Sequence, residues 1–444
     1  MSLPDLIELV PLDKPVRAEV TVPGSKSITN RSLVLAALSE GETTLPGALW
    51  SEDTQVMVDC LQELGFMVNV EEDHQESCNR TITVYGKSGL VPPGGTETRP
   101  LELFVGNAGT AARFLTALVC LGKGLYRLHG VPRMHERPQA PLFHALRELG
   151  YRIESANDKL PALIYGAGPR AAQCRVSINE SSQFASALLL SAGAGKWQVS
   201  VSGDNAEESP YLAMTSRLIA AFPRSGGRFQ VEPDASSASY FWAAGFLLSF
   251  DEPVQAVSNQ NKPFPARVYE LASVIGVKVG PATDWQVDAA FPRFLPLPPT
   301  VSRQTDLGDS IMTAIVLAPF SGRAVRFTDL GRLRVQECER VKALRTELAR
   351  CGAKVVEEGD TLTVFPSQLH GAEIETYNDH RMAMCFAILG LKVPGIKVNN
   401  PSCVKKTFPN FFQKLAAPPP GGLGAKTLEG KHGRILREAE LFAQ

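Results

Sequence analysis

Six times along this 444-residue chain, a short stretch of polar or small residues leads directly into an apolar segment with helical spacing. The stretches lie about 55 to 80 residues apart, an interval that is too long for a common solenoid repeat but suits a repeated subdomain. Polar groups at six helix starts could converge on one anionic ligand, although capped helix starts occur in any fold. The polar stretches and the helices predicted after them are 25–27 with 32–38, 106–110 with 111–121, 181–183 with 184–192, 234–237 with 238–248, 309–310 with 311–318, and 378–380 with 382–391.

The first repeat indicates which elements each unit contains. Around the helix at 32–38, the pattern predicts strands at 18–22 and 43–45, a helix at 54–64, and paired strands at 67–70 and 81–84. The unit is therefore β, α, β, α, β, β.

A short strand at 228–232 stops at Pro233, just before the fourth polar stretch. Three units precede this point and three follow it. We therefore predict an α/β fold of two similar lobes, each of three βαβαββ units. Residues 23–231 form one lobe, and residues 1–22 with 232–444 form the other.

The two ends of the chain are predicted to be an edge strand and a tail outside the core. Residues 1–12 alternate weakly, as in an edge strand. Residues 417–424 are rich in Pro and Gly and are typical of a linker. The charged tail that follows, 427–444, is expected to lie outside the core, where it could form a helix.

Charge and cysteine usage exclude several functional classes. Lys and Arg number 45 against 46 Asp and Glu, so general binding to nucleic acid or membrane is not expected and any basic site must be local. The eight Cys are scattered without a CxxC motif, which is typical of reduced thiols in the cytoplasm. The N-terminus does not read as a secretory signal. No His and Cys spacing indicates a metal site.

The stretch 23–31, PGSKSITNR, is the best candidate for an anion site. Pro and Gly end the preceding strand, and small hydroxyl residues are expected to cap the helix. Free backbone N–H groups and the positive end of the helix dipole would face a phosphate or carboxylate, with Lys26 and Arg31 adding charge. The same residues would also suit a capped helix with two solvated cations.

Other stretches offer groups for anion binding and proton transfer. Gly109 lets a ligand approach the backbone closely, and 181–183 supplies neutral donors. Asp309 opens an apolar helix and is as suited to an N-cap as to a catalytic base. Arg381 begins a strongly apolar helix, where a buried charge needs an anionic partner.

Nine segments resemble, in order, the signatures of the EPSP synthase family (5-enolpyruvylshikimate-3-phosphate synthase) from about residue 12 to residue 415. These segments are PGSKSITNR, GNAGTAAR, RMHERP, SSQFASALLL, DASSASYF, GDSIMT, RVQECER, YNDHRMAM and KKTFPNFF. The resemblance implies two lobes of three βαβαββ units, with the ligand cleft between them. It also implies transfer of the enolpyruvyl group of phosphoenolpyruvate to the 5-hydroxyl of shikimate 3-phosphate, without metal or organic cofactor.

The resemblance also implies residue roles. Asp309 would handle the hydroxyl proton, Glu337 would serve the methylene carbon, and Lys26 would touch both substrates. The residues expected to bind phosphoenolpyruvate are Gly109, Arg137, Gln183, Arg340, Arg381 and Lys406. Those expected to bind shikimate 3-phosphate are Ser27, Arg31, Ser181, Ser182, Tyr211 and Asp309. We further expect a cytoplasmic monomer that is inhibited by glyphosate in competition with phosphoenolpyruvate.

Three positions depart from the family pattern. Gln336 replaces a Lys that many members use to contact the shikimate hydroxyls. Phe114 replaces a Pro common in bacterial and plant members. Glu208 stands where a Ser is usual, two residues before Pro210.

Two alternatives stay open. One is the related enolpyruvyl transferase that acts on UDP-N-acetylglucosamine, against which PGSKSITNR and SSQFASALLL argue. The other is a catalytically silent paralogue that only binds an anionic metabolite. Gln336 favours the silent paralogue, whereas Lys26, Asp309 and Glu337 favour an enzyme.

Overall fold

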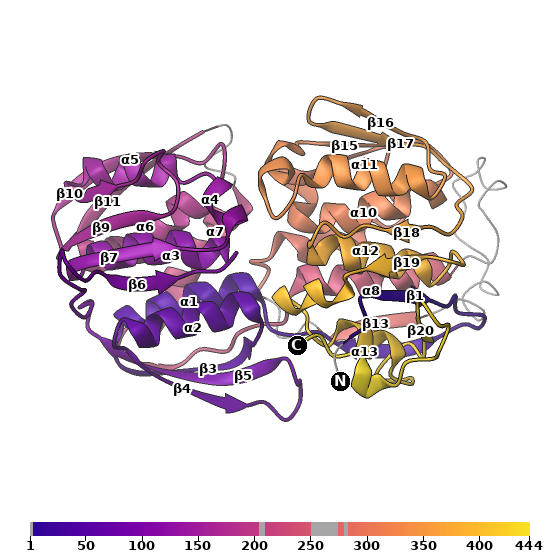
Figure 1. Ribbon diagram of the computed structural model, residues 1–444, viewed down its shortest axis with the longest axis horizontal. Helices are drawn as coiled ribbons and strands as arrows, with labels where there is room; N and C mark the ends of the chain where they lie inside the picture. The colour runs from indigo at the N-terminus through magenta and orange to yellow at the C-terminus, as the bar shows by residue number, and fades with distance from the viewer. Residues whose placement is uncertain (1–2, 204–208, 250–273, 279–282) are drawn as a thin grey trace. The chain divides into compact units, whose positions relative to one another are not determined.

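The computed structural model describes residues 3–203, 209–249, 274–278 and 283–444 (Figure 1). The chain divides into two compact units. The first unit combines Met1–Val22 with Pro233–Gln444, and the second unit is Pro23–Glu232. Glu208, one of the three departures from the family pattern, lies outside the described residues.

The second unit contains two four-stranded sheets with the same pattern of strand directions. In each sheet the first pair of strands is parallel and the next two pairs are antiparallel. One sheet has the order β12 (Gly227–Arg228), β3 (Glu40–Leu49), β5 (Asn79–Lys87) and β4 (Met67–Glu72). The other has the order β6 (Leu101–Phe104), β7 (Lys123–His129), β9 (Ala162–Ala167) and β8 (Arg152–Glu154). A parallel pair, β10 (Ala172–Ser177) and β11 (Trp197–Ser202), completes the described strands of the unit.

The first unit repeats this arrangement. One sheet has the order β14 (Thr300–Ser302), β15 (Val325–Thr328), β17 (Thr361–Val364) and β16 (Val355–Glu358). The other has the order β18 (Glu373–Ile374), β19 (Lys397–Asn399), β1 (Leu6–Leu9) and β20 (Thr427–Glu429). Both have the parallel, antiparallel, antiparallel pattern. The parallel pair is β2 (Arg17–Thr21) with β13 (Val274–Lys278). The predicted α/β class is confirmed.

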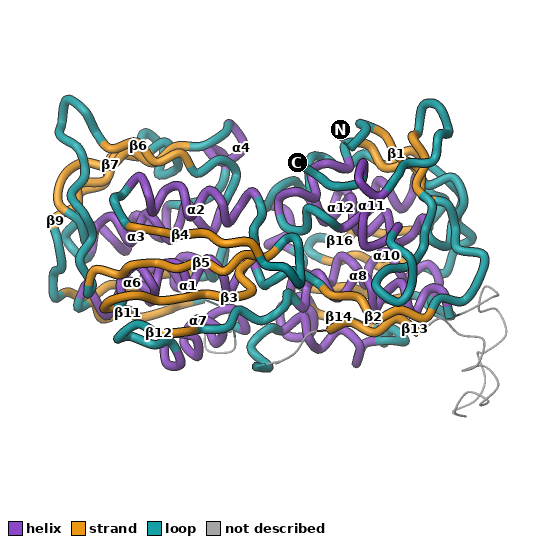
Figure 2. Tube along the Cα trace, turned by 90° about the horizontal axis from the view of Figure 1, so that it is seen from below, coloured by secondary structure: helices purple, strands orange, loops and turns teal. Residues whose placement is uncertain are grey.

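Each unit packs three helices against one another in its interior, and these six helices begin at the six polar stretches, as predicted. They are α1 (Lys26–Leu38), α3 (Gly109–Cys120) and α6 (Gln183–Gly195) in the second unit, and α8 (Ala235–Leu248), α10 (Ile311–Leu317) and α12 (His380–Gly390) in the first. Every residue of α3 and of α10 is buried. A helix that is apolar on all sides is stable only when neighbours surround it. In Figure 2, α1, α3 and α6 of the second unit lie between β6 and β7 on one side and β3 and β11 on the other.

Shorter or more amphipathic helices cover the outside of the units. They are α2 (Glu52–Glu63), α4 (Pro132–Glu136), α5 (Ala140–Glu148), α7 (Pro210–Ala221), α11 (Arg340–Arg350) and α13 (Phe411–Ala416). Among the described residues, none of the helices is both long enough and apolar enough to cross a membrane.

The expectations for the two chain ends were wrong for one shared reason. The tail supplies β20, which pairs with β1, so β1 is an inner strand with β19 on its other side. Leu436 and Leu441 of the tail are buried in the core of the first unit. A Pro- and Gly-rich segment can therefore lead into a packed element, because the apolar tail residues find a surface that sequence periodicity does not reveal.

We expect deletion of residues 417–444 to lower the melting temperature by at least about 10 °C. Leu423, Leu436 and Leu441 are buried, and burial of a Leu side chain is worth about 1.5–3 kcal/mol. The free energy lost should shift the melting temperature by about 2–4 °C per kcal/mol in a unit of this size. Differential scanning calorimetry would measure the change. Replacement of the exposed Ile435 by Ser is the control. A truncated protein that melts within about 2 °C of the full chain would contradict the packing of the tail into the core of the first unit.

Candidate functional site: two clusters of charged residues

The first cluster begins where the second unit places the start of α1. A Cβ atom on Gly24 would lie 1.9 Å from the carbonyl oxygen of Gly47, so only glycine allows this close backbone approach. The Gly24 N–H donates to Asn79 Oδ1 at 2.8 Å, which fixes the turn. Ser25 occupies the N-cap position, but its side chain makes no capping hydrogen bond with any described residue. The predicted hydroxyl cap is therefore wrong.

Lys26 lies in the first turn of α1 and is held by a carboxylate that the sequence analysis did not identify. Its Nζ lies 3.0 Å from Oδ2 of Asp53, at the start of α2. The Lys26 side chain is 17% exposed and that of Asp53 is 3% exposed. The ammonium group is thus oriented by a buried partner while it stays accessible to a ligand.

Arg31 is a buried cation surrounded by neutral oxygens. Its Nε donates to Thr215 Oγ1 (2.8 Å), and its two terminal nitrogens donate to the Ser27 carbonyl (2.9 Å) and Ser186 Oγ (3.2 Å). Its guanidinium also lies over the ring of Phe114, 5.3 Å from the centroid.

Within the described part of the chain, no carboxylate lies within ion-pair distance of Arg31. Burial lowers its pKa to about 10, an effect that the charge of Tyr211 opposes. A buried charge without a counter-ion is unfavourable, so Arg31 is suited to receive an anionic ligand.

Two further arginines lie at the starts of α3 and α6. Arg137 donates to the Asn107 carbonyl (3.1 Å), and Arg113 donates to Gln183 Oε1 (2.7 Å). Gln183 in turn donates to Thr110 Oγ1 at 3.2 Å. Both arginines are nearly fully buried. The predicted residues Gly109, Arg137 and Gln183 therefore share one polar cluster, which also contains Arg113.

The remaining predicted residues of the second unit lie on its helix starts. Ser181 Oγ accepts the Gln183 N–H at 3.2 Å, and Ser182 is buried at the N-cap of α6 without a side-chain capping bond to described residues. Tyr211 lies in the first turn of α7, and its carbonyl accepts from Thr215 Oγ1 at 2.8 Å. These hydroxyls belong to the same set of helix starts as the cations.

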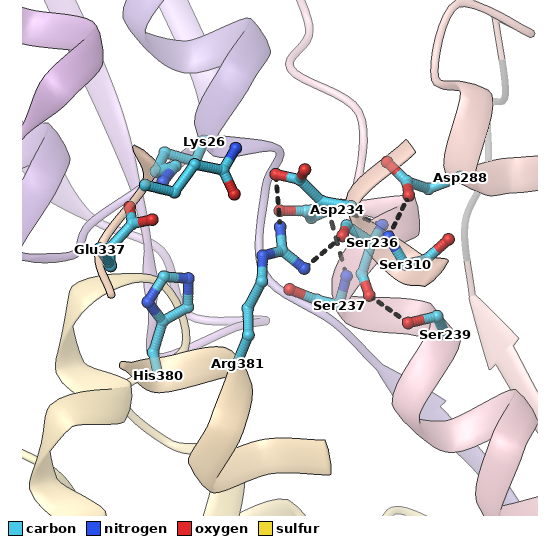
Figure 3. Close-up of polar contacts among 12 residues, drawn as sticks. Lys26, Asp234, Ser236, Ser237, Ser239, Asp288, Ser310, Glu337, His380 and Arg381 are labelled. Atoms are coloured by element: carbon cyan, nitrogen blue, oxygen red, sulfur yellow. Dashed lines mark hydrogen bonds and ion pairs between the residues drawn. The ribbon is translucent and has the colours of Figure 1, made fainter. Parts of the chain in front are cut away.

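The second cluster lies in the first unit, at the starts of α8 and α12. Asp234 caps α8 by accepting the N–H groups of Ser236 and Ser237. Arg381 donates to Ser236 Oγ at 2.8 Å, a contact drawn in Figure 3, and to the Tyr240 hydroxyl at 3.4 Å. The sequence predicts that Arg381 needs an anionic partner, without identifying it. In the structure that partner is Asp309, whose Oδ2 lies 3.6 Å from Nη2 of Arg381.

Asp309 lies in a 3₁₀ turn, Gly308–Ser310, and is not the N-cap of α10, a position that Ser310 occupies. Its Oδ1 accepts from Nη2 of Arg303 at 2.7 Å. Burial alone would raise the pKa of Asp309, but the charges of Arg381, Arg303 and Arg340 outweigh this effect and hold the pKa well below its usual range. Asp309 is therefore ionised at neutral pH.

Asp288 is a second carboxylate beside Asp309, and the sequence analysis did not identify it. Its Oδ1 accepts the Ser310 N–H at 2.7 Å, and Figure 3 shows the two residues facing each other. Burial, followed by repulsion from Asp309, raises the pKa of Asp288 to about 6, although Arg381 and Ser310 act in the opposite direction.

We expect Asp288→Asn to raise the melting temperature at pH 8 by several degrees and to have less effect at pH 5. Because the folded pKa is about 6, against an ordinary value of 3.8, folding favours the protonated carboxyl, and stability is lost as the pH rises through 6. Asn can still accept the Ser310 N–H without this penalty, which is on the order of 1–3 kcal/mol. Thermal melts at both pH values measure the difference, with the exposed Glu358→Gln as control. An equal change at both pH values would refute the assignment.

Arg340 connects the two remaining carboxylates of this cluster. It donates through Nε (2.7 Å) and Nη2 (3.2 Å) to Asp379, which also caps α12. Nη2 of Arg340 lies 2.8 Å from Oε2 of Glu337. Gln336 Oε1 accepts from Nη1 of the same arginine. The Arg340 side chain is 1% exposed, and its pKa is raised because Asp379 and Glu337 outweigh burial.

The position of Arg340 suits two tasks. It orients Glu337, whose side chain is 9% exposed, and it adds positive charge next to Asp309. Lys406, predicted to bind a substrate, is buried at the end of the 3₁₀ segment Pro401–Lys406. In the described residues, no set of His, Cys, Asp or Glu side chains is arranged to hold a metal ion.

The two clusters differ in chemical capacity. The cluster of the second unit contains four cations, Lys26, Arg31, Arg113 and Arg137, with Asp53 paired to one of them. It can bind phosphate and carboxylate groups. The cluster of the first unit combines three arginines with the carboxylates Asp288, Asp309, Glu337 and Asp379. It can both bind an anion and transfer protons.

A comparison with known proteins identifies the family of this chain. The EPSP synthase family (3-phosphoshikimate 1-carboxyvinyltransferase) matches residues 11–415. A 3-phosphoshikimate 1-carboxyvinyltransferase of Trichormus variabilis is 38% identical over 93% of this chain and 98% of its own length. A protein of the same name from Laribacter hongkongensis is 39% identical over 90% of this chain and 97% of its own.

Solved structures show the same fold. An EPSP synthase of Acinetobacter baumannii aligns with a TM-score of 0.63 over 93% of this chain and 97% of its own, at 21% identity. The enolpyruvyl transferase NikO of Streptomyces tendae aligns with a TM-score of 0.64 over 96% of this chain and 99% of its own, at 16% identity. At these identities the structures support the fold, whereas the family is shown by the sequence matches. The chain belongs to the EPSP synthase family.

Proposed function

We propose that this chain is a 3-phosphoshikimate 1-carboxyvinyltransferase. It transfers the enolpyruvyl group of phosphoenolpyruvate to the 5-hydroxyl of shikimate 3-phosphate and releases phosphate, a step in the synthesis of aromatic amino acids. The observation that carries the proposal is the distribution of charge. Among the described residues, Arg31 is buried without a carboxylate in ion-pair distance, as an anion site requires, while Asp309 and Glu337 are carboxylates held by arginines.

Shikimate 3-phosphate requires anion-binding and hydroxyl-binding groups. Arg31 can neutralise one of its anionic groups, and Lys26 can contact it from the same helix. Ser27, Ser181, Ser182 and Tyr211 supply neutral donors at the helix starts of the second unit. Asp309 and Gln336 are assigned to the hydroxyl groups.

Phosphoenolpyruvate carries a phosphate and a carboxylate, and more cations are assigned to it. Arg137 and Gln183 flank Gly109 at the start of α3, where the absence of a Cβ on Gly109 leaves room for the guanidinium groups of Arg137 and Arg113. Arg381, Arg340 and Lys406 are assigned to it from the first unit. Arg340 is already bound to Asp379 and Glu337, so its contribution is positive charge and the orientation of Glu337.

The reaction needs two proton transfers. Asp309 takes the proton of the 5-hydroxyl as its oxygen attacks C2 of phosphoenolpyruvate, and Glu337 delivers a proton to the methylene carbon. Lys26 stabilises the charge that develops on the reacting groups. The tetrahedral ketal phosphate then loses a proton from its methyl group and expels phosphate, which gives the enolpyruvyl product.

A steady-state assay of phosphate release, with each substrate omitted in turn, tests the proposal. We expect release only when both shikimate 3-phosphate and phosphoenolpyruvate are present. Release with UDP-N-acetylglucosamine in place of shikimate 3-phosphate would identify the related transferase instead. Binding of shikimate 3-phosphate without release would identify a silent paralogue. Light scattering on the eluted protein would test the expected monomer.

We expect Gly109→Ala to raise the KM for phosphoenolpyruvate on the order of tenfold. A Cβ atom at this position would lie 2.6 Å from Nη2 of Arg137 and 2.8 Å from Nη1 of Arg113, so both guanidinium groups must move. The inhibition constant of glyphosate should rise more than KM, because the methyl group crowds the inhibitor as well. Gly193→Ala is the matched control, since no atom lies within 4 Å of its Cβ. Equal changes in both constants would contradict the steric argument.

A further inference from the structure

Arg303 is a buried cation with a single ionic partner among the residues that the structure describes. Its side chain is 7% exposed, and its Nη2 donates to Oδ1 of Asp309 at 2.7 Å. In the described chain, no other carboxylate lies within ion-pair distance of Arg303, and its Nε has no hydrogen-bond partner. A buried guanidinium with this single ionic contact is thus dedicated to Asp309.

The contact with Arg303 distinguishes the two oxygens of Asp309. Oδ1 is taken by the hydrogen bond from Arg303, whereas Oδ2 lies 3.6 Å from Arg381, which is beyond hydrogen-bond distance. Among the residues that the structure describes, none donates a hydrogen bond to Oδ2. The side chain of Asp309 remains 21% exposed, so a ligand can reach it.

The backbone between Arg303 and Asp309 is held at both ends. Ser302 Oγ accepts the N–H groups of Gln304 and Thr305, which starts the turn Arg303–Leu307. At the far end, Asp288 accepts the N–H of Ser310, directly after Asp309. The guanidinium and the carboxylate are therefore brought together by a short, fixed turn.

We propose that Arg303 is a positioning residue for the transfer reaction: it holds Asp309 through Oδ1 so that Oδ2 faces the substrate and takes the 5-hydroxyl proton. The O–H bond of the substrate breaks and an O–H bond to Oδ2 forms, while the substrate oxygen bonds to C2 of phosphoenolpyruvate. The C2=C3 π bond breaks at the same time, and its electron pair bonds the proton that Glu337 delivers to the methylene carbon. This inference rests on the proposed role of Asp309 as the base.

Four charged groups surround Asp309, and they act differently once substrate binds. Arg381 from α12 and Arg340 from α11 attract the carboxylate, and Asp288 from the segment Val287–Phe294 repels it. Anionic phosphoenolpyruvate would offset Arg381, to which it is assigned, and so weaken its hold on Asp309. Arg303 stays bonded to Oδ1, which keeps Asp309 ionised in the complex.

The test compares Arg303→Met and Arg303→Lys with the wild-type enzyme in pH profiles of kcat between pH 3.5 and 9. Met removes the charge, so the pKa of Asp309 should rise from well below its usual range toward its usual value. An acidic limb that lies below the measured range in the wild-type enzyme should then move into that range. We expect kcat at its maximum to fall roughly tenfold as orientation is lost. Arg303→Lys restores the positive charge on a single ammonium group, so its acidic limb should move less than that of Arg303→Met. Arg345→Met, which removes a half-exposed arginine paired with Glu357, is the control.

The outcomes separate this inference from the proposed function. Asp309→Asn is measured in parallel, and if it keeps wild-type turnover, the role of Asp309 itself is wrong. If Asp309→Asn is inactive but the acidic limb of Arg303→Met does not move, Arg303 does not position the base. If Arg303→Met does not fold, the pH profile of Arg303→Lys decides, and a profile identical to wild type in both limb and height would overturn the proposal.

Discussion

Replacing Asp309 with Asn should lower kcat by a factor on the order of 100 or more, while shikimate 3-phosphate still binds. The amide has nearly the shape of the carboxylate, but it cannot accept the hydroxyl proton. Arg303 and Arg381 keep Asp309 ionised in the wild-type protein, so the base is present throughout the neutral range. The measurement is kcat under saturating substrates, together with calorimetric binding of shikimate 3-phosphate.

The binding measurement is needed because Asn also leaves Arg303 without its carboxylate. Breaking one side of a buried pair can destabilise a protein by about 3–5 kcal/mol. A folded variant that binds shikimate 3-phosphate but does not turn over separates catalysis from stability. If Asp309 were structural, turnover would stay near wild type in the folded fraction, and that result would contradict its role as base.

Replacing Arg31 with Met should raise the KM for shikimate 3-phosphate by about 100-fold or more, with little loss of thermal stability. Loss of a charge-assisted contact in a buried site is worth roughly 3 kcal/mol, and each 1.4 kcal/mol is tenfold in affinity. Met removes a cation whose burial is unfavourable, as its pKa of about 10 indicates. This gain offsets the hydrogen bonds that Thr215 and Ser186 lose.

Steady-state kinetics and thermal melts of the same preparations measure both effects. Arg31→Lys keeps the charge but lacks the planar set of donors of a guanidinium. Its KM for shikimate 3-phosphate should therefore lie between the values of the wild type and of Arg31→Met. Arg217→Met, which removes an exposed arginine of α7, serves as the control. A large drop in melting temperature with unchanged KM would show that Arg31 is structural and that the anion binds elsewhere.

The interior helices were predictable because their apolar residues leave little alternative to burial. The segment 111–121 has no polar face, and α3 is buried along its whole length. The order of strands in the sheets was harder to predict from the sequence. β1 was interpreted as an edge strand because its partner β20 lies more than 400 residues away in sequence, in a tail of low apolar periodicity.

Some charged residues of the site could be predicted from the sequence, and others could not. Arg381 could be identified because a cation at the start of a strongly apolar helix requires an explanation, and Arg31 because it follows small hydroxyl residues at a predicted helix start. Arg303, Asp288 and Asp53 have no such local signal. Their importance depends on the partners that the fold brings to them, across spacings as different as 6 residues for Arg303 and Asp309 and 27 for Lys26 and Asp53.

In the proposed reaction, one carboxylate of the first unit takes the proton of a hydroxyl and another delivers a proton to the methylene carbon of phosphoenolpyruvate. The most direct test runs the reaction in deuterium oxide and analyses the product by mass spectrometry and NMR. We predict deuterium in the methylene group of the product with wild-type enzyme, because Glu337 delivers a solvent-derived proton before the intermediate collapses. Glu337→Gln should give neither label nor appreciable turnover. A wild-type product formed at full rate without deuterium in its methylene group would contradict the account.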